Sequence, residues 1–213
     1  MTKRKTIYHL ILDQSGSMQD CSQNTINGFN EQLNRIKQLG NEFLEEEITI
    51  GLTTFNNAVT LNYFGVSPET VKPLDQHSYC PSGPTSLLDA IGITSKTIEM
   101  EIQRRHQNLP ISVVIVIITD GYENASSSFN LVDIKSLISS LEETGKWTFA
   151  FIGANLDAVD VAVQMSIKRQ NSFSFDKKSM KSEVWDKIND SITTYCFKKK
   201  SNIINDNLFN DAK

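Results

Sequence analysis

Short apolar runs alternate with amphipathic stretches along almost the whole chain. Six of these runs are rich in β-branched and large apolar residues and have the length of strands. They lie at residues 6–12, 48–55, 58–64, 112–119, 147–152 and 172–175. Most stretches between them repeat their apolar residues every three or four positions, which is the period of an amphipathic helix. The alternation therefore predicts an α/β fold in which helices cover a sheet.

The helical period predicts five helices. The first begins near Thr25 and ends at Gly40 and Asn41, which are stop signals. Thr85 or Ser86 can cap the second, because both side chains offer an oxygen to the first backbone N–H groups. The other four helices are expected at residues 88–102, 131–141, 157–165 and 180–195.

The run at residues 112–119 is apolar without alternation, as expected of a central parallel strand that is covered on both faces. Asn56 and Asn57 separate the second and third runs and favour a hairpin turn. The sequence thus predicts a Rossmann-like, doubly wound, mostly parallel six-stranded sheet with one antiparallel edge strand and helices on both faces. Without internal repeats or long linkers, we expect one domain over residues 1–197 and a polar, loosely ordered tail over residues 198–213.

Charge and hydropathy argue against several classes of protein. The chain of 213 residues has a formal net charge of −4, whereas a nucleic-acid binder needs a surplus of Lys and Arg. No apolar run approaches the roughly 20 residues of a membrane-spanning helix. The basic N-terminus precedes an apolar run that is short and ends at Asp13, unlike a signal peptide. We therefore expect a cytoplasmic or virion-internal protein that binds neither nucleic acid nor membrane.

Oxygen-bearing side chains stand where the predicted strands end and a helix begins. Asp13, Ser15 and Ser17 follow the first strand, Thr85 precedes the second helix, and Asp120 follows the central strand. Ligands of doubly wound sheets bind beyond the carboxyl ends of the strands. Two carboxylates and three hydroxyls suit hard cations such as Mg²⁺, Mn²⁺ or Ca²⁺. An octahedral Mg²⁺ takes about six oxygens, so one position would remain open to an outside group.

Each of these residues also has an ordinary structural interpretation. Asp13 and Asp120 can be carboxylates at strand ends, while Ser15, Ser17 and Thr85 can cap helices. The group as a whole favours a cation, because gathered carboxylates repel one another unless a positive charge offsets them. In an extended segment alternate residues project the same way, so three of the oxygens can converge on one point.

The same motifs resemble a known family. Asp13-Gln-Ser-Gly-Ser17, together with Thr85 and Asp120-Gly121, resembles the metal-ion-dependent adhesion site of von Willebrand factor type A (vWA) domains. The resemblance covers residues 8–195 and is greatest to small intracellular members from bacteria and phages. It implies the vWA fold and a protein that acts in the cytoplasm of a bacterial cell, whether the gene is cellular or phage-borne.

The resemblance also implies a role for each site residue. Ser15 and Ser17 would contact the ion directly, and Asp13 would act largely through water. Thr85 would join the ion in the ligand-competent state, and Asp120 matches the distal aspartate. A Glu or Asp carboxylate of a protein partner would complete the shell. One departure is the proline before the threonine, where small members often carry glycine, which bears on the mobility of that turn.

These features favour a divalent-metal-dependent protein-binding module rather than an enzyme, with no catalytic residue or organic cofactor. Two alternatives stay open: a structural or assembly component of a phage particle or multi-protein complex, and a Mg²⁺-dependent hydrolase. A dehalogenase-type site needs a second aspartate where Ser15 stands, and no phosphate-binding loop motif is present. The partner's identity and the oligomeric state are left open by the sequence.

Several other polar residues invite a functional interpretation. Asp89 is interpreted as a charge at a helix N-terminus or a partner of the site's ligands. Glu123 and Asn124 are interpreted as solvated loop residues, and His9 as a buried, hydrogen-bonded core residue.

Overall fold

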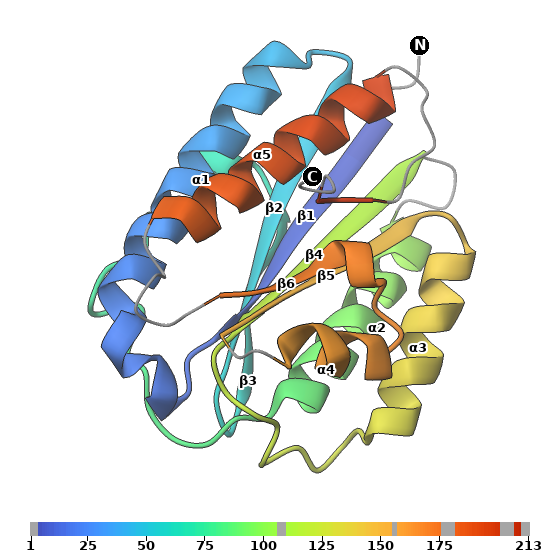
Figure 1. Cartoon of the computed structure of the whole chain (residues 1–213). Coiled ribbons are helices and arrows are strands. Elements are labelled where there is room, and N and C mark those ends of the chain that lie inside the picture. The colour runs from blue at the N-terminus through green and yellow to red at the C-terminus, as the bar shows by residue number, and fades with distance from the viewer. Residues whose placement is uncertain (1–3, 106–109, 155–156, 176–181, 201–206, 210–213) are drawn as a thin grey trace.

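The chain folds into one six-stranded sheet with helices on both faces (Figure 1). The strand order is β3-β2-β1-β4-β5-β6, and every neighbouring pair is parallel except β2 and β3, which are antiparallel. The mostly parallel, doubly wound sheet with one antiparallel edge strand is thereby confirmed. The strands are β1 (Arg4–Asp13), β2 (Glu46–Phe55), β3 (Val59–Val66), β4 (Ile111–Thr119), β5 (Trp147–Gly153) and β6 (Ser172–Ser174). This computed structural model describes residues 4–105, 110–154, 157–175, 182–200 and 207–209.

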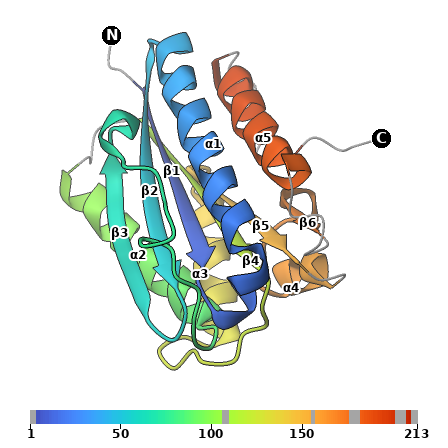
Figure 2. The same ribbon diagram turned by 90° about the vertical axis from the view of Figure 1, so that its left-hand side faces the viewer.

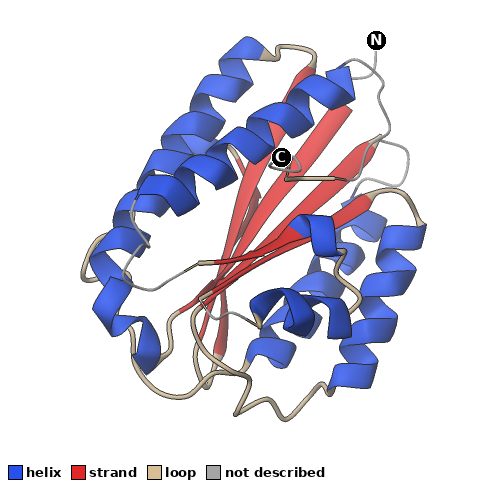
Figure 3. Cartoon of the chain, in the orientation of Figure 1, coloured by secondary structure: helices blue, strands red, loops and turns tan. Residues whose placement is uncertain are grey.

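Helices α1 and α5 cover one face of the sheet, and α2, α3 and α4 cover the other (Figures 1 and 2). Among the described residues, three short 3₁₀ helices, η1 to η3, lie in the connections, and Figure 3 shows how the layers alternate. The helices are α1 (Ser22–Glu42), α2 (Leu87–Arg105), α3 (Leu131–Glu143), α4 (Ala158–Gln164) and α5 (Ser182–Lys200). The 3₁₀ helices are η1 (Gly16–Cys21), η2 (Pro68–Thr70) and η3 (Arg169–Asn171). Within the described ranges, none of the helices is long and apolar enough to cross a lipid bilayer.

The central strands are buried on both faces, which explains their continuous apolar runs. On β1, Leu10 and Leu12 pack under α1 and α5, whereas Ile7 and Ile11 pack under α2 and α3. Strand side chains alternate between the two faces, so each central strand contributes to two separate cores. The carboxyl ends of β1 and β4 thus lie side by side at one edge of the sheet.

Helix α1 differs at both ends from the sequence prediction. It begins at Ser22, directly after η1, and it continues through Gly40 to Glu42. The helix passes the predicted stop because Leu39 and Phe43 on either side of it are buried, and the Phe43 N–H donates to the Leu39 carbonyl. Burial of these side chains offsets the cost of about 1 kcal/mol of a glycine inside a helix.

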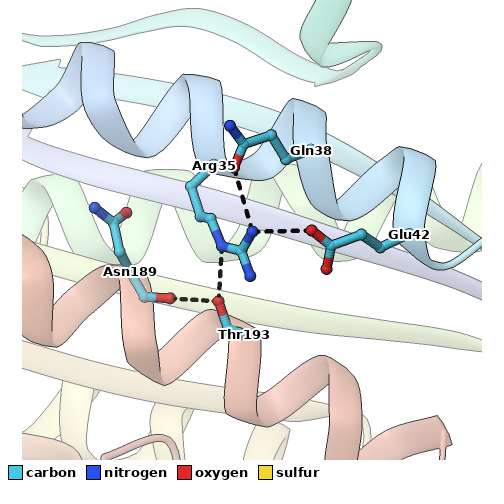
Figure 4. A network of polar contacts seen from close by, with 5 residues as sticks. All are labelled: Arg35, Gln38, Glu42, Asn189 and Thr193. Carbon is cyan, nitrogen blue, oxygen red and sulfur yellow. Dashed lines mark hydrogen bonds and ion pairs between the residues drawn. The ribbon is translucent and has the colours of Figure 1, made fainter.

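Polar contacts hold α1 against α5, as Figure 4 shows. The guanidinium of Arg35 donates to Thr193 Oγ1 at 3.0 Å on α5, and to Gln38 and Glu42 on its own helix. The Thr193 hydroxyl in turn donates to the Asn189 carbonyl. The two helices are therefore joined by a polar network as well as by apolar packing.

Two apolar residues near the C-terminus are buried in the structure. Helix α5 runs to Lys200, past the expected boundary at residue 197. Leu208 and Phe209 are buried in the same core as α1 and α5, and Phe209 packs edge-on against Phe173 of β6. This apolar pair therefore packs at the sheet edge, and the expected polar tail over residues 198–213 lies mostly outside the described residues.

Candidate metal centre

The site begins with the parallel pairing of β1 and β4. Leu12 lies opposite Ile118 in the register, so Asp13 and Thr119, the last residues of the two strands, come together. The Thr119 hydroxyl donates to Asp13 Oδ2 at 2.5 Å. Asp120 follows at once, and its side chain is 3% exposed. Two acidic residues that are far apart in sequence thus share one edge of the sheet.

The turn after β1 connects these two carboxylates. The Ser15 N–H donates to Asp13 Oδ1 at 2.7 Å, and the Ser15 and Ser17 hydroxyl oxygens are 3.0 Å apart. The Ser17 hydroxyl donates to Asp120 Oδ1 at 2.6 Å. Asp13 and Ser15 are buried, whereas Ser17 faces solvent. The alternate positions of the motif therefore converge as predicted, with one hydroxyl open to an incoming group.

The loop before α2 brings Thr85 to the same place. The Ser82 N–H donates to the Gln14 carbonyl, and the Gly16 N–H donates to the Gly83 carbonyl at 2.8 Å. Gly83 has a φ of 75°, a left-handed conformation that glycine adopts without strain. These backbone contacts fix the loop against the turn that carries the serines.

The position of Gly121 shows how closely the side chains converge. A Cβ atom on Gly121 would lie 3.0 Å from Thr85 Oγ1, 3.2 Å from Ser17 Oγ and 3.6 Å from Asp13 Oδ2. Oxygens from the end of β1 and the turn after it, and from the loop before α2, thus surround one point, and a side chain at position 121 would crowd them. With the hydrogen bonds of Ser15 and Asp120 to this group, all five predicted residues are brought together.

The electrostatics of the group are those of a buried acidic pair. Burial raises the pKa of the Asp13 carboxyl; hydrogen bonds from Thr119 and Ser15 lower it, and the nearby charge of Asp120 raises it again. Nowhere in the described ranges do three His, Cys, Asp or Glu side chains gather as metal ligands. The five residues brought together here offer two carboxylates and three hydroxyls, a donor set that fits Mg²⁺, Mn²⁺ or Ca²⁺.

Two residues that sequence reasoning missed support Asp13. Thr119 holds the carboxylate as described, and the Tyr79 hydroxyl donates to the Asp13 backbone carbonyl at 2.5 Å. In a sequence, a threonine within a strand is interpreted as an ordinary β-branched strand residue. A tyrosine in a loop is interpreted as a side chain that packs against the core. Only the adjacency of Thr119 to Asp120 could have suggested a role.

Asn124 was predicted as a solvated loop residue, and that interpretation is incomplete. Its side-chain oxygen accepts the Thr85 N–H at 2.8 Å, although Asn124 is exposed. The Thr85 carbonyl accepts the backbone N–H groups of Asn124 and Ala125. The threonine backbone is therefore held on both sides by the loop that follows β4.

The interpretation of Glu123 as a solvated residue is wrong. Its half-buried carboxylate accepts the Leu88 N–H at the start of α2, and also the N–H groups of Ala125 and Ser126. The first of these contacts satisfies an N–H group that has no partner within the helix. Glu123 thus ties the loop after β4 to α2.

Asp89 completes this connection from the other side. Its carboxylate accepts the backbone N–H groups of Ser127, Ser128 and Phe129. The residue was expected to be a helix N-terminal charge or a partner of the site's ligands. It lies in the first turn of α2 and acts on the loop that follows Asp120 rather than on a ligand side chain.

Comparison with known proteins places the fold in a family. The family model described as von Willebrand factor type A domain matches residues 9–191. No curated protein sequence matches the chain.

Solved structures with the same fold have distant sequences. They include proximal thread matrix protein 1 from the mussel byssus with a zinc-occupied MIDAS motif (15% identity, TM-score 0.56, covering 92% of this chain and 46% of that one). Manganese-loaded TRAP protein of Plasmodium vivax is 15% identical (TM-score 0.55, 84% and 71%). The vWF domain of the pilus tip protein Mfa5 from Porphyromonas gingivalis is 10% identical (TM-score 0.59, 92% and 97%). The chain spans less than half the length of the mussel protein.

Proposed function

Because the chain belongs to the von Willebrand factor type A domain family, we propose that it is a divalent-metal-dependent protein-binding module. In this proposal Asp13, Ser15, Ser17, Thr85 and Asp120 hold Mg²⁺, with Mn²⁺ or Ca²⁺ as alternatives. A Glu or Asp carboxylate of a protein partner binds the same ion.

One observation carries the proposal: Ser17, Thr85 and Asp13 oxygens from separate segments lie around the position next to Gly121. Two buried carboxylates lie in this group; burial is the main cause that raises the pKa of the Asp13 carboxyl, and the nearby charge of Asp120 adds to the rise. A cation would offset that repulsion. Relatives of the same fold whose structures are described as zinc-occupied and manganese-loaded give further support.

The chemistry of the donor set accounts for recognition of an acid. When bound, the ion would be contacted directly by hydroxyl oxygens, with Asp13 acting largely through water, so it would keep much of its positive charge and attract an external anion. Thr119 and Tyr79 orient Asp13, and the contacts of Asn124 hold the Thr85 backbone in place. The exposed Ser17 lies where a partner can approach. These residues bind and orient, and no reaction is assigned to them.

Thermal unfolding with and without Mg²⁺ tests the site. We expect Mg²⁺ to raise the melting temperature, because an ion that binds only the folded state stabilises it by mass action. The rise should vanish in Ser15→Ala/Ser17→Ala. The double variant Ser127→Ala/Ser128→Ala removes two exposed hydroxyls from a nearby loop and should keep the rise. A wild-type melting temperature that changes with neither Mg²⁺ nor EDTA would contradict the proposal.

A further inference from the structure

A cavity of about 260 Å³ opens beside the candidate metal centre. Asp120 and Gly121 line it, and Asp120 is one of the five site residues, so the cavity and the five-residue site share part of their surface. The rest comes from the carboxyl ends of β4 and β5, from α4, and from the first turns of α2 and α3. Its apolar lining includes Leu88, Leu131, Phe151, Ala158, Val161 and Met165.

Apolar side chains also lie exposed at this cavity. Tyr122 is 59% exposed and Leu131 is 40% exposed, and both line it. The Tyr122 hydroxyl donates to the Asp157 carboxylate at 3.0 Å, which holds the ring between the loop after β4 and the start of α4. Large apolar side chains that are exposed to solvent around a cavity are typical of a surface that binds a protein partner.

The size of the cavity limits what can fill it. Small-molecule and cofactor sites usually enclose about 300–1,000 Å³, and this cavity is smaller. A dry cavity of about 150 Å³ is already large enough to bind benzene. One large apolar side chain therefore fits, and such side chains in pockets are the usual anchors of protein interfaces.

We propose that this cavity receives an aromatic or large aliphatic side chain from the same partner segment whose carboxylate reaches the metal. The inference rests on the proposed function and specifies the partner. Because Asp120 and Gly121 belong to both surfaces, and an extended chain spans about 3.3–3.6 Å per residue, the two groups are only a few residues apart. The recognition element is an acidic residue with a large apolar neighbour in a short segment.

The two contacts contribute differently to binding. The carboxylate provides charge complementarity to the ion and makes binding depend on the metal. The apolar side chain leaves water for a mostly apolar cavity, which strengthens binding on the order of tenfold to a hundredfold. Truncating the apolar side chain should therefore weaken binding by that factor and leave its metal dependence intact.

Selection from a displayed library of short random peptides tests the inference. The immobilised protein is probed in Mg²⁺ and in EDTA, and synthetic copies of the selected peptides are then titrated. We expect peptides with Glu or Asp near Trp, Phe, Leu or Met, recovered in Mg²⁺ and lost in EDTA. Replacing the apolar residue of such a peptide by Ala should weaken binding at least about tenfold.

Two protein variants assign the apolar contact to the cavity. Leu131→Asp places a charge on its wall, at a helix N-terminus where a carboxylate is tolerated. It should abolish the preference for an apolar neighbour while acidic peptides are still selected. Val132→Asp is the matched control, because Val132 is the next residue, is 72% exposed and does not line the cavity. Val161→Phe fills the cavity from α4 and should act like Leu131→Asp.

The outcomes separate this inference from the proposed function. Acidic peptides without an apolar preference, or a preference that survives Leu131→Asp and Val161→Phe, would overturn the inference and leave metal-dependent acid binding standing. Recovery of no acidic peptides in Mg²⁺ would overturn the proposed function itself. Apolar peptides bound equally in EDTA, or self-association that Leu131→Asp abolishes, would overturn the inference by giving the cavity a different occupant.

Discussion

Asp13 is the residue on which the candidate site depends most. Its two carboxylate oxygens accept from the Ser15 N–H and the Thr119 hydroxyl, and its backbone carbonyl accepts from Tyr79. Its side chain is therefore oriented by the protein itself. Groups that orient a ligand side chain commonly matter to metal affinity almost as much as the ligand does.

Thr119→Val tests this orienting role. The substitution keeps the β-branched shape in a strand and removes the hydroxyl that donates to Asp13. We expect Mg²⁺ affinity, measured by calorimetric titration, to fall by about 10–100-fold. Thr60→Val, at an exposed position on β3, should leave the affinity unchanged. Wild-type affinity in Thr119→Val would show that Asp13 does not need this contact.

His9 makes folding stability depend on pH. The ring is fully buried, its Nε2 lies 2.9 Å from Thr53 Oγ1, and burial lowers its pKa to about 3. This confirms the predicted core role. Between about pH 6.5 and pH 3 the unfolded chain gains a proton on this ring that the folded chain does not, so the free energy of unfolding falls as pH falls.

His9→Gln should remove this dependence and can keep a hydrogen bond to Thr53. In urea unfolding at several pH values below 6, we expect the wild type to lose up to about 1.4 kcal/mol per pH unit more than the variant. His77→Gln, at an exposed position, should keep the wild-type slope. If the free energy of unfolding fell with pH equally steeply in the wild type and in His9→Gln, His9 would not be the source of the pH dependence.

At the scale of elements, the loop after β4 and helix α2 are tied in both directions. Glu123 on the loop accepts from the start of α2, and Asp89 on α2 accepts three N–H groups of the loop. Sequence could not predict this, because the donors are backbone N–H groups, which meet the carboxylates only after folding. Together, Glu123 and Asp89 hold the segment between Asp120 and α3 in place.

The contact between α1 and α5 depends on a glycine. A Cβ atom on Gly28 would lie 2.1 Å from the ring of the buried Trp185, whereas a Cβ on Gly40 of the same helix would meet nothing within 4 Å. We expect Gly28→Ala to lower the free energy of unfolding by about 1–3 kcal/mol through overpacking. Gly40→Ala should raise it by about 0.5–1 kcal/mol. Urea unfolding measures the free energy of unfolding of both variants. Equal changes in Gly28→Ala and Gly40→Ala would contradict the claim that Gly28 is needed for the contact with Trp185.

For the whole molecule, the sequence predicted the sheet well because its central strands are buried on both faces. The continuous apolar run of β4 and the Asn56-Asn57 turn sufficed for the parallel core and the antiparallel edge. The limits of α1 and the docking of Leu208 and Phe209 were missed, since burial of a few side chains overrides local stop signals and polarity.

The candidate site was predictable in part. Asp13, Ser15, Ser17, Thr85 and Asp120 offered oxygens at strand ends and helix starts, where parallel topology gathers them. The contacts that orient them come from a strand threonine, a loop tyrosine and backbone N–H groups, which have no sequence pattern of their own. The apolar cavity was missed because it forms only where two strands and three helices meet.

A crystal structure grown with Mn²⁺, with the ion located by anomalous scattering, tests the central claim most directly. We predict one peak among the oxygens of Ser15, Ser17 and Thr85, with the carboxylates of Asp13 and Asp120 bound to it directly or through water. A peak elsewhere, or no peak in crystals whose site is open to solvent, would contradict the claim that these residues form a metal centre.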